Sequence, residues 1–268
     1  MPISFFKKEQ VICQGKAVEK VFLSSGTTGN QSKHLVSDIS IYKESYTKAF
    51  ELFYGDLRQY CILSLLPNYR EQEDSSLIFM VDDLISKSEN IDSGFYLNDY
   101  KKLDIKLKQL EEKGQKTILF GVSYALLDLA EQFAQKLKHT IIIETGGTKG
   151  KKEIIKEELH QKLKTAFSLD KIHSEYGMSE LLSQSYSDGN GNFKCPHWKK
   201  ILIRDLNDPL TIIGENKTGG INVIDLANIY SCPFIATQDL GKSFNDGTFK
   251  ILGRFDNSDL RGCNLLIQ

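Results

Sequence analysis

Between residues 21 and 167, short β-rich runs alternate with amphipathic stretches of helical periodicity, and this alternation constrains the fold more than any other feature. The pairs are KVFLSS before residues 39–57, CILSLL before 76–86, TILFG before 124–137 and TIIIETGG before 151–167. Strands that alternate with helices pair in a parallel or mixed sheet, because each helix carries the chain back across the sheet. We therefore predict an α/β fold whose first strand runs from Val21 to Leu23.

Residues typical of helix ends agree with this pattern. Ser37-Asp38 and Asn98-Asp99 precede two of the helical stretches, and their side-chain oxygens can accept the free amide protons of a first turn. Gly114 stands where the helix after Asp99 should end, since glycine readily adopts the left-handed conformation of a helix terminus.

After about Leu181 the chain changes to short strands and tight turns. The segments DGNGN (188–192), ENKTGG (215–220) and NDG (245–247) separate β-rich runs, which is typical of antiparallel structure. We predict an α/β nucleotide-binding part over residues 1–181. Residues 182–268 are expected to form a smaller β-rich subdomain, a barrel or a sheet packed on the first part. No linker-like segment separates the two.

The composition excludes several classes of protein. The 34 basic and 35 acidic residues give a net charge of -1, so no global field attracts nucleic acid or an anionic membrane. The five cysteines form no CxxC pair, which argues against a disulfide framework or a zinc site. No apolar run has the length of a signal peptide or a membrane span. These features favour a cytoplasmic protein.

A hydroxyl-rich loop directly follows the first predicted strand. Its residues are Ser24, Ser25, Gly26, Thr27, Thr28 and Gly29. Glycines let backbone amides approach an anion closely, hydroxyls donate further hydrogen bonds, and Lys33 can add a positive charge, so the loop is suited to phosphate. It is not the P-loop of nucleotide triphosphatases, because no Gly-Lys-Ser/Thr closes it. An ordinary Ser/Gly turn explains the loop equally well at this point.

A second segment, Ser174-Glu175-Tyr176-Gly177-Met178-Ser179-Glu180, is expected between a long helix and a strand. An aromatic face such as that of Tyr176 can stack on a purine, and a carboxylate such as Glu180 can hold Mg²⁺ together with substrate phosphates. Read alone, the segment is also compatible with an exposed carboxylate beside a turn glycine.

Three shorter segments add further candidates. Gly146-Gly147 follow an apolar run, at the end of a strand where open α/β sheets bind ligands. Asp239 can accept hydrogen bonds from both hydroxyls of a ribose, and Arg254, after Gly253, can bind a phosphate or a ribose oxygen. Each could also be an ordinary turn or surface residue.

The order of these segments along the chain resembles that of the acyl-adenylate-forming superfamily. Its pyrophosphate-binding loop is similar to residues 24–29, its adenine-flanking glycines to Gly146-Gly147, and its Tyr-Gly-x-Thr-Glu motif to residues 176–180. Asp239 and Gly253-Arg254 correspond to its ribose-binding Asp and its Gly-Arg pair.

The resemblance implies a role for each matched residue. Tyr176 and Gly177 would contact adenine, Ser179 the α-phosphate and Glu180 a Mg²⁺ ion, while Asp239 would bind the ribose and Arg254 the ribose or a phosphate. On this basis Glu180, Ser179 and Arg254 are the candidate catalytic residues, and ATP and Mg²⁺ are the implied cofactors.

Within the superfamily, the chain most resembles the acyl-protein synthetases of bacterial luminescence systems, with phenylacetate–CoA ligases second. The resemblance rests on SSGTTG followed by Ser-Lys, and on residues 258–263, SDLRGC. In those synthetases a cysteine near the C-terminus takes the acyl group as a thioester, which makes Cys263 the fourth candidate catalytic residue. A small buried apolar residue is the other interpretation of Cys263.

Some features depart from the superfamily pattern. Only a short segment precedes Ser24, and the chain ends soon after Gly253-Arg254, so the N-terminal lobe and the mobile C-terminal domain are expected to be absent. Gln238, Ser179 and Asn257 replace the usual Gly, Thr and Asp or Lys. An incomplete large domain would expose apolar surface for a second copy or a partner chain.

The resemblance implies that the chain activates a carboxylic acid, a fatty acid in the synthetases, as an acyl-adenylate and passes it to a thiol. That thiol could belong to Cys263, to an acyl carrier protein or to CoA, and an acyl reductase is a further expected partner. One alternative is a non-catalytic or partner-dependent nucleotide-binding subunit. Another is an ATP-independent acyltransferase that acts through Cys263.

Overall fold

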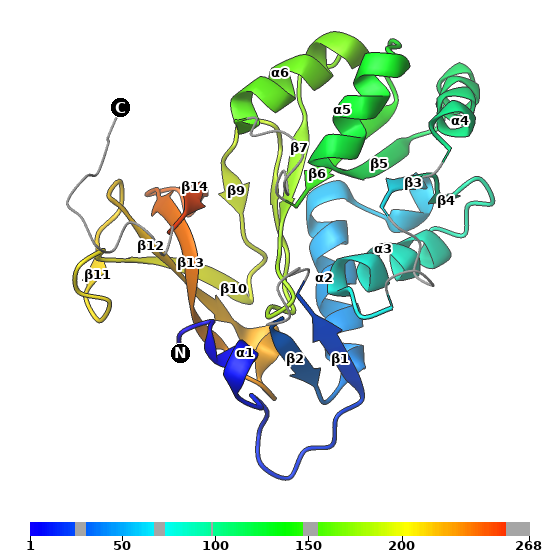
Figure 1. The fold of residues 1–268 in the computed structure, drawn as a ribbon. Helices are drawn as coiled ribbons and strands as arrows, with labels where there is room; N and C mark the ends of the chain where they lie inside the picture. The colour runs from blue at the N-terminus through cyan, green and yellow to red at the C-terminus, as the bar shows by residue number, and fades with distance from the viewer. Residues whose placement is uncertain (25–30, 67–72, 98, 147–154, 256–268) are drawn as a thin grey trace.

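The computed structural model describes residues 1–24, 31–66, 73–97, 99–146 and 155–255 (Figure 1). The helices are α1 (Phe5–Lys8), α2 (Ile39–Tyr54), α3 (Ser76–Lys87), α4 (Tyr100–Glu112), α5 (Ser123–Gln132) and α6 (Lys156–Phe167), with short 3-10 helices η1 (Leu57–Gln59) and η3 (Leu226–Asn228). The first strands are β1 (Lys20–Leu23), β2 (Lys33–Val36), β3 (Cys61–Leu65), β4 (Gly94–Phe95), β5 (Thr117–Val122), β6 (Thr140–Thr145) and β7 (His173–Tyr176). The remaining strands are β8 (Ser185–Ser187), β9 (Phe193–Lys194), β10 (Lys199–Arg204), β11 (Ile212–Ile213), β12 (Thr218–Asp225), β13 (Phe234–Ser243) and β14 (Phe249–Arg254).

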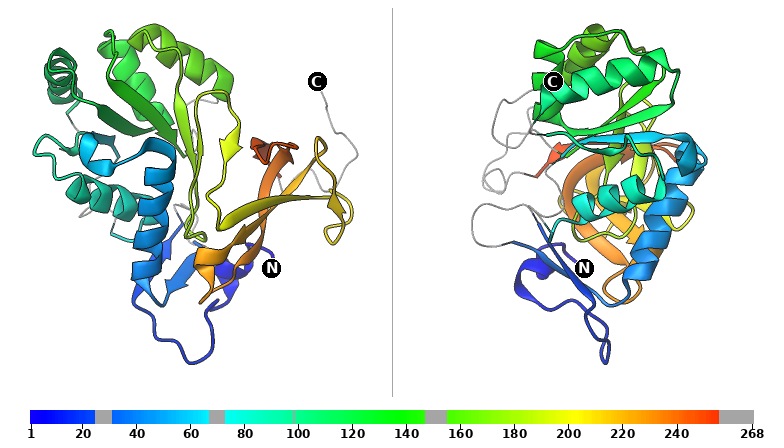
Figure 2. Two further views of the ribbon diagram at one scale, coloured as in Figure 1. Left: turned by 180° about the vertical axis from the view of Figure 1, so that it is seen from behind. Right: turned by 90° about the vertical axis from the view of Figure 1, so that its right-hand side faces the viewer.

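One mixed sheet of 12 strands runs through the described chain in the order β11-β10-β12-β13-β14-β9-β8-β7-β6-β5-β3-β4. Strands β4, β3, β5, β6 and β7 are parallel, and from β7 to β11 every pairing is antiparallel. The predicted mixed α/β fold with a β-rich continuation is confirmed. The β-rich part joins the parallel strands edge to edge, so it is neither a separate barrel nor a second packed sheet, and the two parts lie side by side (Figures 1 and 2). The division at residue 181 stays a prediction.

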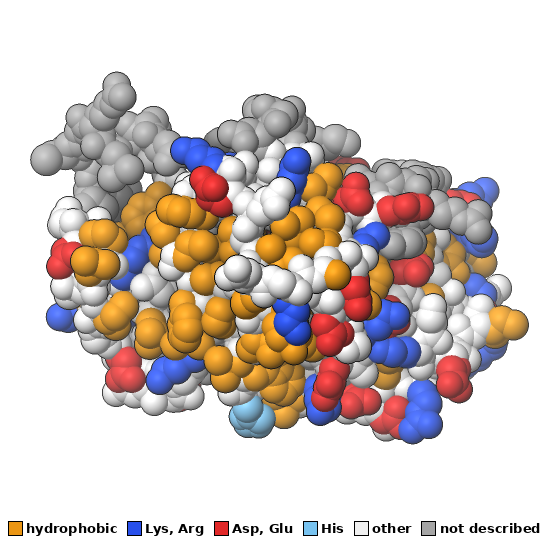
Figure 3. Space-filling view, turned by 90° about the horizontal axis from the view of Figure 1, so that it is seen from below, with side chains coloured by type: hydrophobic (Ala, Val, Ile, Leu, Met, Phe, Trp, Pro, Cys, Tyr) orange, Lys and Arg blue, Asp and Glu red, His pale blue; other side chains and the backbone are white. Residues whose placement is uncertain are grey.

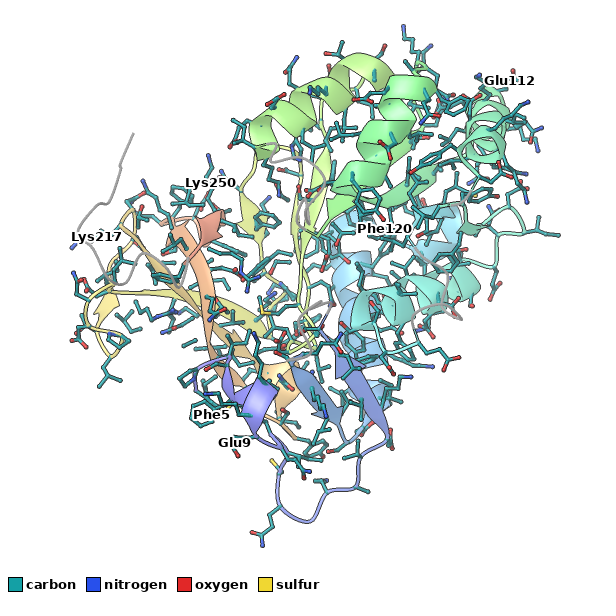
Figure 4. The ribbon with its side chains drawn as sticks, in the orientation of Figure 1. Phe5, Glu9, Glu112, Phe120, Lys217 and Lys250 are labelled. Carbon is teal, nitrogen blue, oxygen red and sulfur yellow. The ribbon has the colours of Figure 1, made fainter. Side chains whose placement is uncertain are left out.

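Helices cover both faces of the parallel half. Leu63 and Leu119 pack with α4, α5 and α6, whereas Ile62 and Phe120 pack with α2 and α3 on the opposite face. This arrangement follows from the two-residue period of the strands, which sends successive side chains to opposite faces. Phe120 lies in the interior of this half, while Lys217 and Lys250 mark the antiparallel half (Figure 4).

The helix starts predicted from the sequence are confirmed. The Asp38 side chain accepts from the Ser40 amide at 3.0 Å, and the Asp99 side chain accepts from the Lys102 amide at 2.8 Å. Gly114 follows α4 with φ +65°, the left-handed conformation expected after a helix.

Two glycines expected in a turn lie inside a strand instead. β12 begins at Thr218, so Gly219 pairs with β13, Gly220 pairs with both β10 and β13, and residues 214–217 connect β11 to β12. A Cβ on Gly220 would stand 2.5 Å from the guanidinium carbon of Arg204, so the missing side chain makes room for that arginine. The sequence pattern ENKTGG could not reveal this, because Arg204 is distant along the chain.

The first predicted strand, β1, does not belong to the main sheet, contrary to the prediction. β1 pairs antiparallel with β2, which the sequence pattern did not identify, and the two form a sheet of their own below the main sheet (Figure 1). Phe22 and Val36 face inward and join the core formed with α2 and α3. Side chains of β1 alternate between two faces, and a hairpin packed against helices is enough to bury one of them. β1 therefore does not have to pair with the parallel strands.

Apolar side chains gather on the face seen from below (Figure 3). Phe5 and Phe234 are among the large apolar residues that remain exposed, at 46% and 57%. Within the described ranges, no helix combines the length and the apolar character needed to cross a membrane.

Candidate functional site

The hairpin β1–β2 fixes the two ends of the hydroxyl-rich loop. The Ser24 amide donates to the Ser32 carbonyl at 3.0 Å, and the Ser32 amide donates to Ser24 Oγ at 2.9 Å. Gln31 Nε2 donates to the Ser24 carbonyl at 2.7 Å. Accepting a bond uses a lone pair of Ser24 Oγ and leaves its proton able to reach an anion. Ser25, Gly26, Thr27, Thr28 and Gly29 lie outside the described residues.

Lys33 begins β2 and is exposed on the outer face of the hairpin. It borders a groove of about 630 Å³ that also contains Leu23 and Lys7. The position fits a cation near the loop, although Lys33 is on the side of the hairpin opposite its buried face.

The turn after β7 carries the Tyr-Gly-Met-Ser-Glu motif. Ser174, Glu175 and Tyr176 belong to β7, whereas the sequence pattern had placed them between a helix and a strand. A Cβ on Gly177 would stand 2.4 Å from Glu175 Oε1, so the turn leaves β7 past a buried carboxylate that only glycine accommodates.

The loop end and the motif turn meet directly. Ser179 Oγ donates to the Leu23 carbonyl at 3.1 Å, one residue before Ser24. Ser32, at the other end of the loop, lies close enough to the Glu180 carboxylate to favour its charged form, and Glu180 is only 6% exposed. Burial raises the pKa of Glu180. The two segments predicted to contact phosphate and Mg²⁺ therefore lie on the same side of the molecule.

Tyr176, Asp239 and Arg254 form a second group, contributed by β7, β13 and β14. Tyr176 Oη donates to Asp239 Oδ2 at 2.7 Å, and Arg254 Nε lies 3.3 Å from Asp239 Oδ1. Burial raises the pKa of Asp239, a shift that Tyr176 and Arg254 oppose. Tyr176 is 8% exposed, because Phe193 and Phe249 pack edge-on against its ring.

Gly146 directly follows β6, at the end of the strand next to β7. β6 and β7 are parallel neighbours, with Glu144 opposite Ser174, so Gly146 lies at the same edge of the sheet as Tyr176. Its φ of +73° favours glycine, and its carbonyl accepts from Ser123 Oγ at 3.2 Å. Gly147 and Cys263 lie outside the described residues.

The sequence patterns missed several buried polar groups behind the motif turn. Lys199 Nζ donates to the Ser183 carbonyl at 2.9 Å and to the Tyr176 carbonyl at 3.4 Å, and burial lowers the pKa of Lys199. Burial raises the pKa of Glu175 to about 6, although Thr145 Oγ1 donates to it at 2.6 Å. The alternation of KKILIR contained one signal, because it places Lys199 on the inward face with Ile201.

The charges of the site suit a small cation with phosphates. Among the described residues no three His, Cys, Asp or Glu side chains cluster as a ready metal site. Mg²⁺, however, commonly uses one or two carboxylates together with substrate phosphates. Glu180, whose pKa is raised by burial, is a carboxylate that a cation would stabilise in its charged form.

Comparisons with known proteins agree with the geometry. A family model described as "Acyl-protein synthetase, LuxE" matches residues 1–268. No curated protein matches the chain.

Solved structures of the same fold include ATP-bound MatB from Rhodopseudomonas palustris, with a TM-score of 0.67 and 17% identity over 88% of this chain and 48% of that one. MenE from Bacillus subtilis, solved with ATP and magnesium, gives 0.63 and 18% over 90% and 51%. The luciferase-like enzyme of the mealworm Zophobas morio gives 0.62 and 18% over 90% and 59%. The chain thus spans about half the length of these proteins, and at such identities the likeness establishes a shared fold.

Proposed function

The chain belongs to the LuxE family of acyl-protein synthetases, and from that premise we propose that it uses ATP to activate a carboxylic acid as an acyl-adenylate. The acid we propose is a fatty acid, and the final acceptor is a thiol. ATP and Mg²⁺ are the proposed cofactors.

The observation that carries this proposal is the convergence of two groups from four distant segments. Ser179 and Glu180 lie at the ends of the hydroxyl-rich loop, and Tyr176, at the end of β7, bonds to Asp239 beside Arg254. We infer that one nucleotide extends from the Asp239 group to the loop, because Tyr176 and Glu180, in the turn that follows β7, are four positions apart.

The proposed chemistry needs no general base. An oxygen of the ionised acid bonds to the α-phosphorus of ATP, the bond from that phosphorus to the bridging oxygen breaks, and pyrophosphate leaves with the electron pair. The chain's part is to position the two reactants and to stabilise the growing negative charge. Ser24 Oγ can donate to the leaving group, while Asp239 holds the ribose.

Ser179 has a further constraint. A hydroxyl has one proton, and Ser179 Oγ donates it to the Leu23 carbonyl. To donate to the α-phosphate it must exchange that bond, so nucleotide binding and the attachment of β1 to the motif turn are coupled at this residue.

Glu180 is the residue proposed to hold Mg²⁺. Bound there, the ion would offset charge on the phosphates and on the departing pyrophosphate. The carboxylate lies near Ser32 at the loop end, so we expect it and the loop to bind the same phosphates.

In the second proposed step a thiolate attacks the acyl carbonyl carbon, and AMP leaves as the thioester forms. The thiol is that of Cys263 or of an external acceptor, an acyl carrier protein or CoA, and an acyl reductase is the proposed consumer of the product. A subunit that only binds nucleotide would not carry out this step.

Exchange of labelled pyrophosphate into ATP tests the proposal. The purified chain, incubated with MgATP and a series of fatty and aromatic acids, should catalyse exchange that depends on the acid. A Cys263→Ser variant should keep this exchange and lose labelling by radioactive fatty acid if Cys263 is the acceptor. Absence of acid-dependent exchange with every acid, alone or with a carrier protein or reductase, contradicts the proposal.

The same experiment separates the alternatives. MgATP binding without exchange would indicate a nucleotide-binding subunit. Acyl transfer from a preformed thioester that persists in Glu180→Ala would indicate an ATP-independent acyltransferase.

A further inference from the structure

The main chain of the motif turn is held by two buried side chains that no motif includes. His34 Nδ1 lies 2.8 Å from the carbonyl oxygen of Ser179, to which it donates, and Asn228 Nδ2 donates to the carbonyl of Glu180 at 2.9 Å. The two side chains are in contact, since His34 Nε2 lies 2.9 Å from Asn228 Oδ1. A ring that donates to Ser179 through Nδ1 also donates to Asn228 only when Nε2 carries a second proton. Consecutive carbonyls of the proposed phosphate and metal residues thus accept from two side chains that lie against each other.

This pair is enclosed within the protein. His34 and Asn228 are 0% and 1% exposed, and the ring of Phe6 packs edge-on against His34 at 5.4 Å between centroids. Burial lowers the pKa of His34, although the oxygens facing both ring nitrogens oppose that shift. Buried hydrogen bonds hold their partners in fixed geometry, because water cannot replace a broken one.

The pair also connects the motif turn to the loop. His34 is the second residue of β2, two positions after Ser32, while Ser179 Oγ donates to the Leu23 carbonyl on β1. Both strands of the hairpin therefore contact Ser179. The Leu23 carbonyl of β1 accepts from the Ser179 side chain, and the His34 side chain of β2 donates to the Ser179 carbonyl. Movement of the turn would displace the two ends of residues 24–32 together.

The position of Asn228 is itself fixed. The Asp225 carboxylate accepts from the Ala227 amide at 3.2 Å, at the start of η3, and from the Leu182 amide at 2.8 Å. Asp225 therefore joins η3 to the far side of the same turn. A histidine that merely fills the core would not need a partner held in this way.

We propose that His34, acting through Asn228, is a positioning residue that aims Ser179 and Glu180 at the triphosphate and keeps Ser24 and Ser32, the two ends of the hydroxyl-rich loop, in register with them. The inference rests on the proposed function, since it assumes that this turn binds MgATP. It extends that function to two residues outside the matched motifs.

Calorimetric binding of two probes tests the inference. MgATP reaches Ser179 and Glu180, whereas adenosine reaches the Tyr176–Asp239 group alone. His34→Ala should weaken MgATP binding about tenfold and change adenosine binding by less than about twofold, the loss expected for one well-placed hydrogen bond. Asn228→Ala should show the same selectivity. His139→Ala, at an exposed histidine before β6, is the matched control and should change neither.

A double variant identifies the connection. Because the two side chains act as one unit, His34→Ala with Asn228→Ala should lose no more MgATP affinity than the stronger single variant. Equal losses for MgATP and adenosine, or no loss for either, would overturn the inference. So would fully additive losses. If His34→Ala fails to fold, His34→Gln and Asn228→Ala are judged by the same selectivity.

Pyrophosphate exchange keeps this test distinct from that of the proposed function. A wild-type chain that binds MgATP but catalyses no acid-dependent exchange would fail as an acyl-adenylate-forming enzyme, while the binding selectivity would still decide the role of His34. A wild-type chain that binds no MgATP would overturn both.

Discussion

The two groups of the candidate site, the proposed ribose side and the proposed phosphate side, are built in different ways. On the proposed ribose side, the Asp239 side chain contacts the side chains of Tyr176 and Arg254 directly. On the phosphate side, Ser179 and Glu180 are held mainly by their backbone carbonyls, through His34 and Asn228. Ribose binding can depend on the binding side chains alone. Where negative charge develops on phosphate oxygens during a reaction, the binding groups must be held in fixed positions by the surrounding protein.

The largest expected effect lies on the phosphate side. Glu180→Gln removes the carboxylate proposed to hold Mg²⁺, so acid-dependent pyrophosphate exchange should fall about a hundredfold or more. Adenosine affinity should stay within about twofold, because the ribose side is intact. Glu112→Gln, on the exposed face of α4, is the control. Undiminished pyrophosphate exchange in Glu180→Gln would contradict the proposal that the phosphate side depends on this carboxylate.

The buried carboxylate beneath the motif turn should affect stability. The pKa of Glu175 rises from 4.5 to about 6 on folding, so the folded chain binds its proton more tightly than the unfolded chain does. Stability from this group is therefore full below pH 4.5 and declines by about 2 kcal/mol as pH rises through 6.

Urea unfolding of wild type and Glu175→Gln across this pH range measures that decline. The free energy of unfolding of the variant should increase relative to wild type by about 2 kcal/mol between the two ends. A difference that does not change with pH would mean that the pKa of Glu175 is the same in the folded and unfolded chain, and the exposed Glu158→Gln should show no such change.

On the ribose side, Asp239→Asn should weaken AMP binding about tenfold, because the amide keeps one acceptor for Tyr176 and loses the charge and the second acceptor. Calorimetry with AMP measures this change, and the exposed Asp170→Asn serves as control. If Asp239→Asn binds AMP as tightly as wild type, Asp239 is a structural partner of Tyr176 and does not bind the ribose.

The smallest effect is expected from Arg254 on stability. Its side chain is 70% exposed, so its ion pair with Asp239 should contribute less than about 1 kcal/mol. Arg254→Ala should unfold in urea almost as wild type does, while losing a few-fold in AMP affinity. A large loss of stability would show that the ribose side also depends on support, as the phosphate side does.

Much of the α/β half was predictable, because its signals are local. Asp38 and Asp99 begin helices as expected, since a cap involves only neighbouring residues. The hairpin β1–β2 was not, because the pairing of Leu23 with Lys33 depends on which core buries Phe22. Gly220 was assigned to a turn because its contact, Arg204, comes from another strand.

The residues of the candidate site also differ in whether the sequence could identify them. Tyr176, Ser179, Glu180, Asp239 and Arg254 could be named from their motifs, and their roles in binding stay predictions. Lys199 and His34 could not be named, and Glu175 was part of the motif segment but was given no role. The reason is that these polar side chains stand out only through their burial, and burial depends on elements distant in sequence.

The sequence by itself determined which chemical groups are available, their order along the chain and the helices and strands that carry them, since these depend on short-range periodicity and capping. Only the tertiary structure decided that the loop ends meet Glu180, that Tyr176 bonds to Asp239, and that His34 and Asn228 hold the motif turn. Those contacts join residues far apart in the chain, and they form because packing the cores excludes water and leaves each buried polar group to find a partner within the protein.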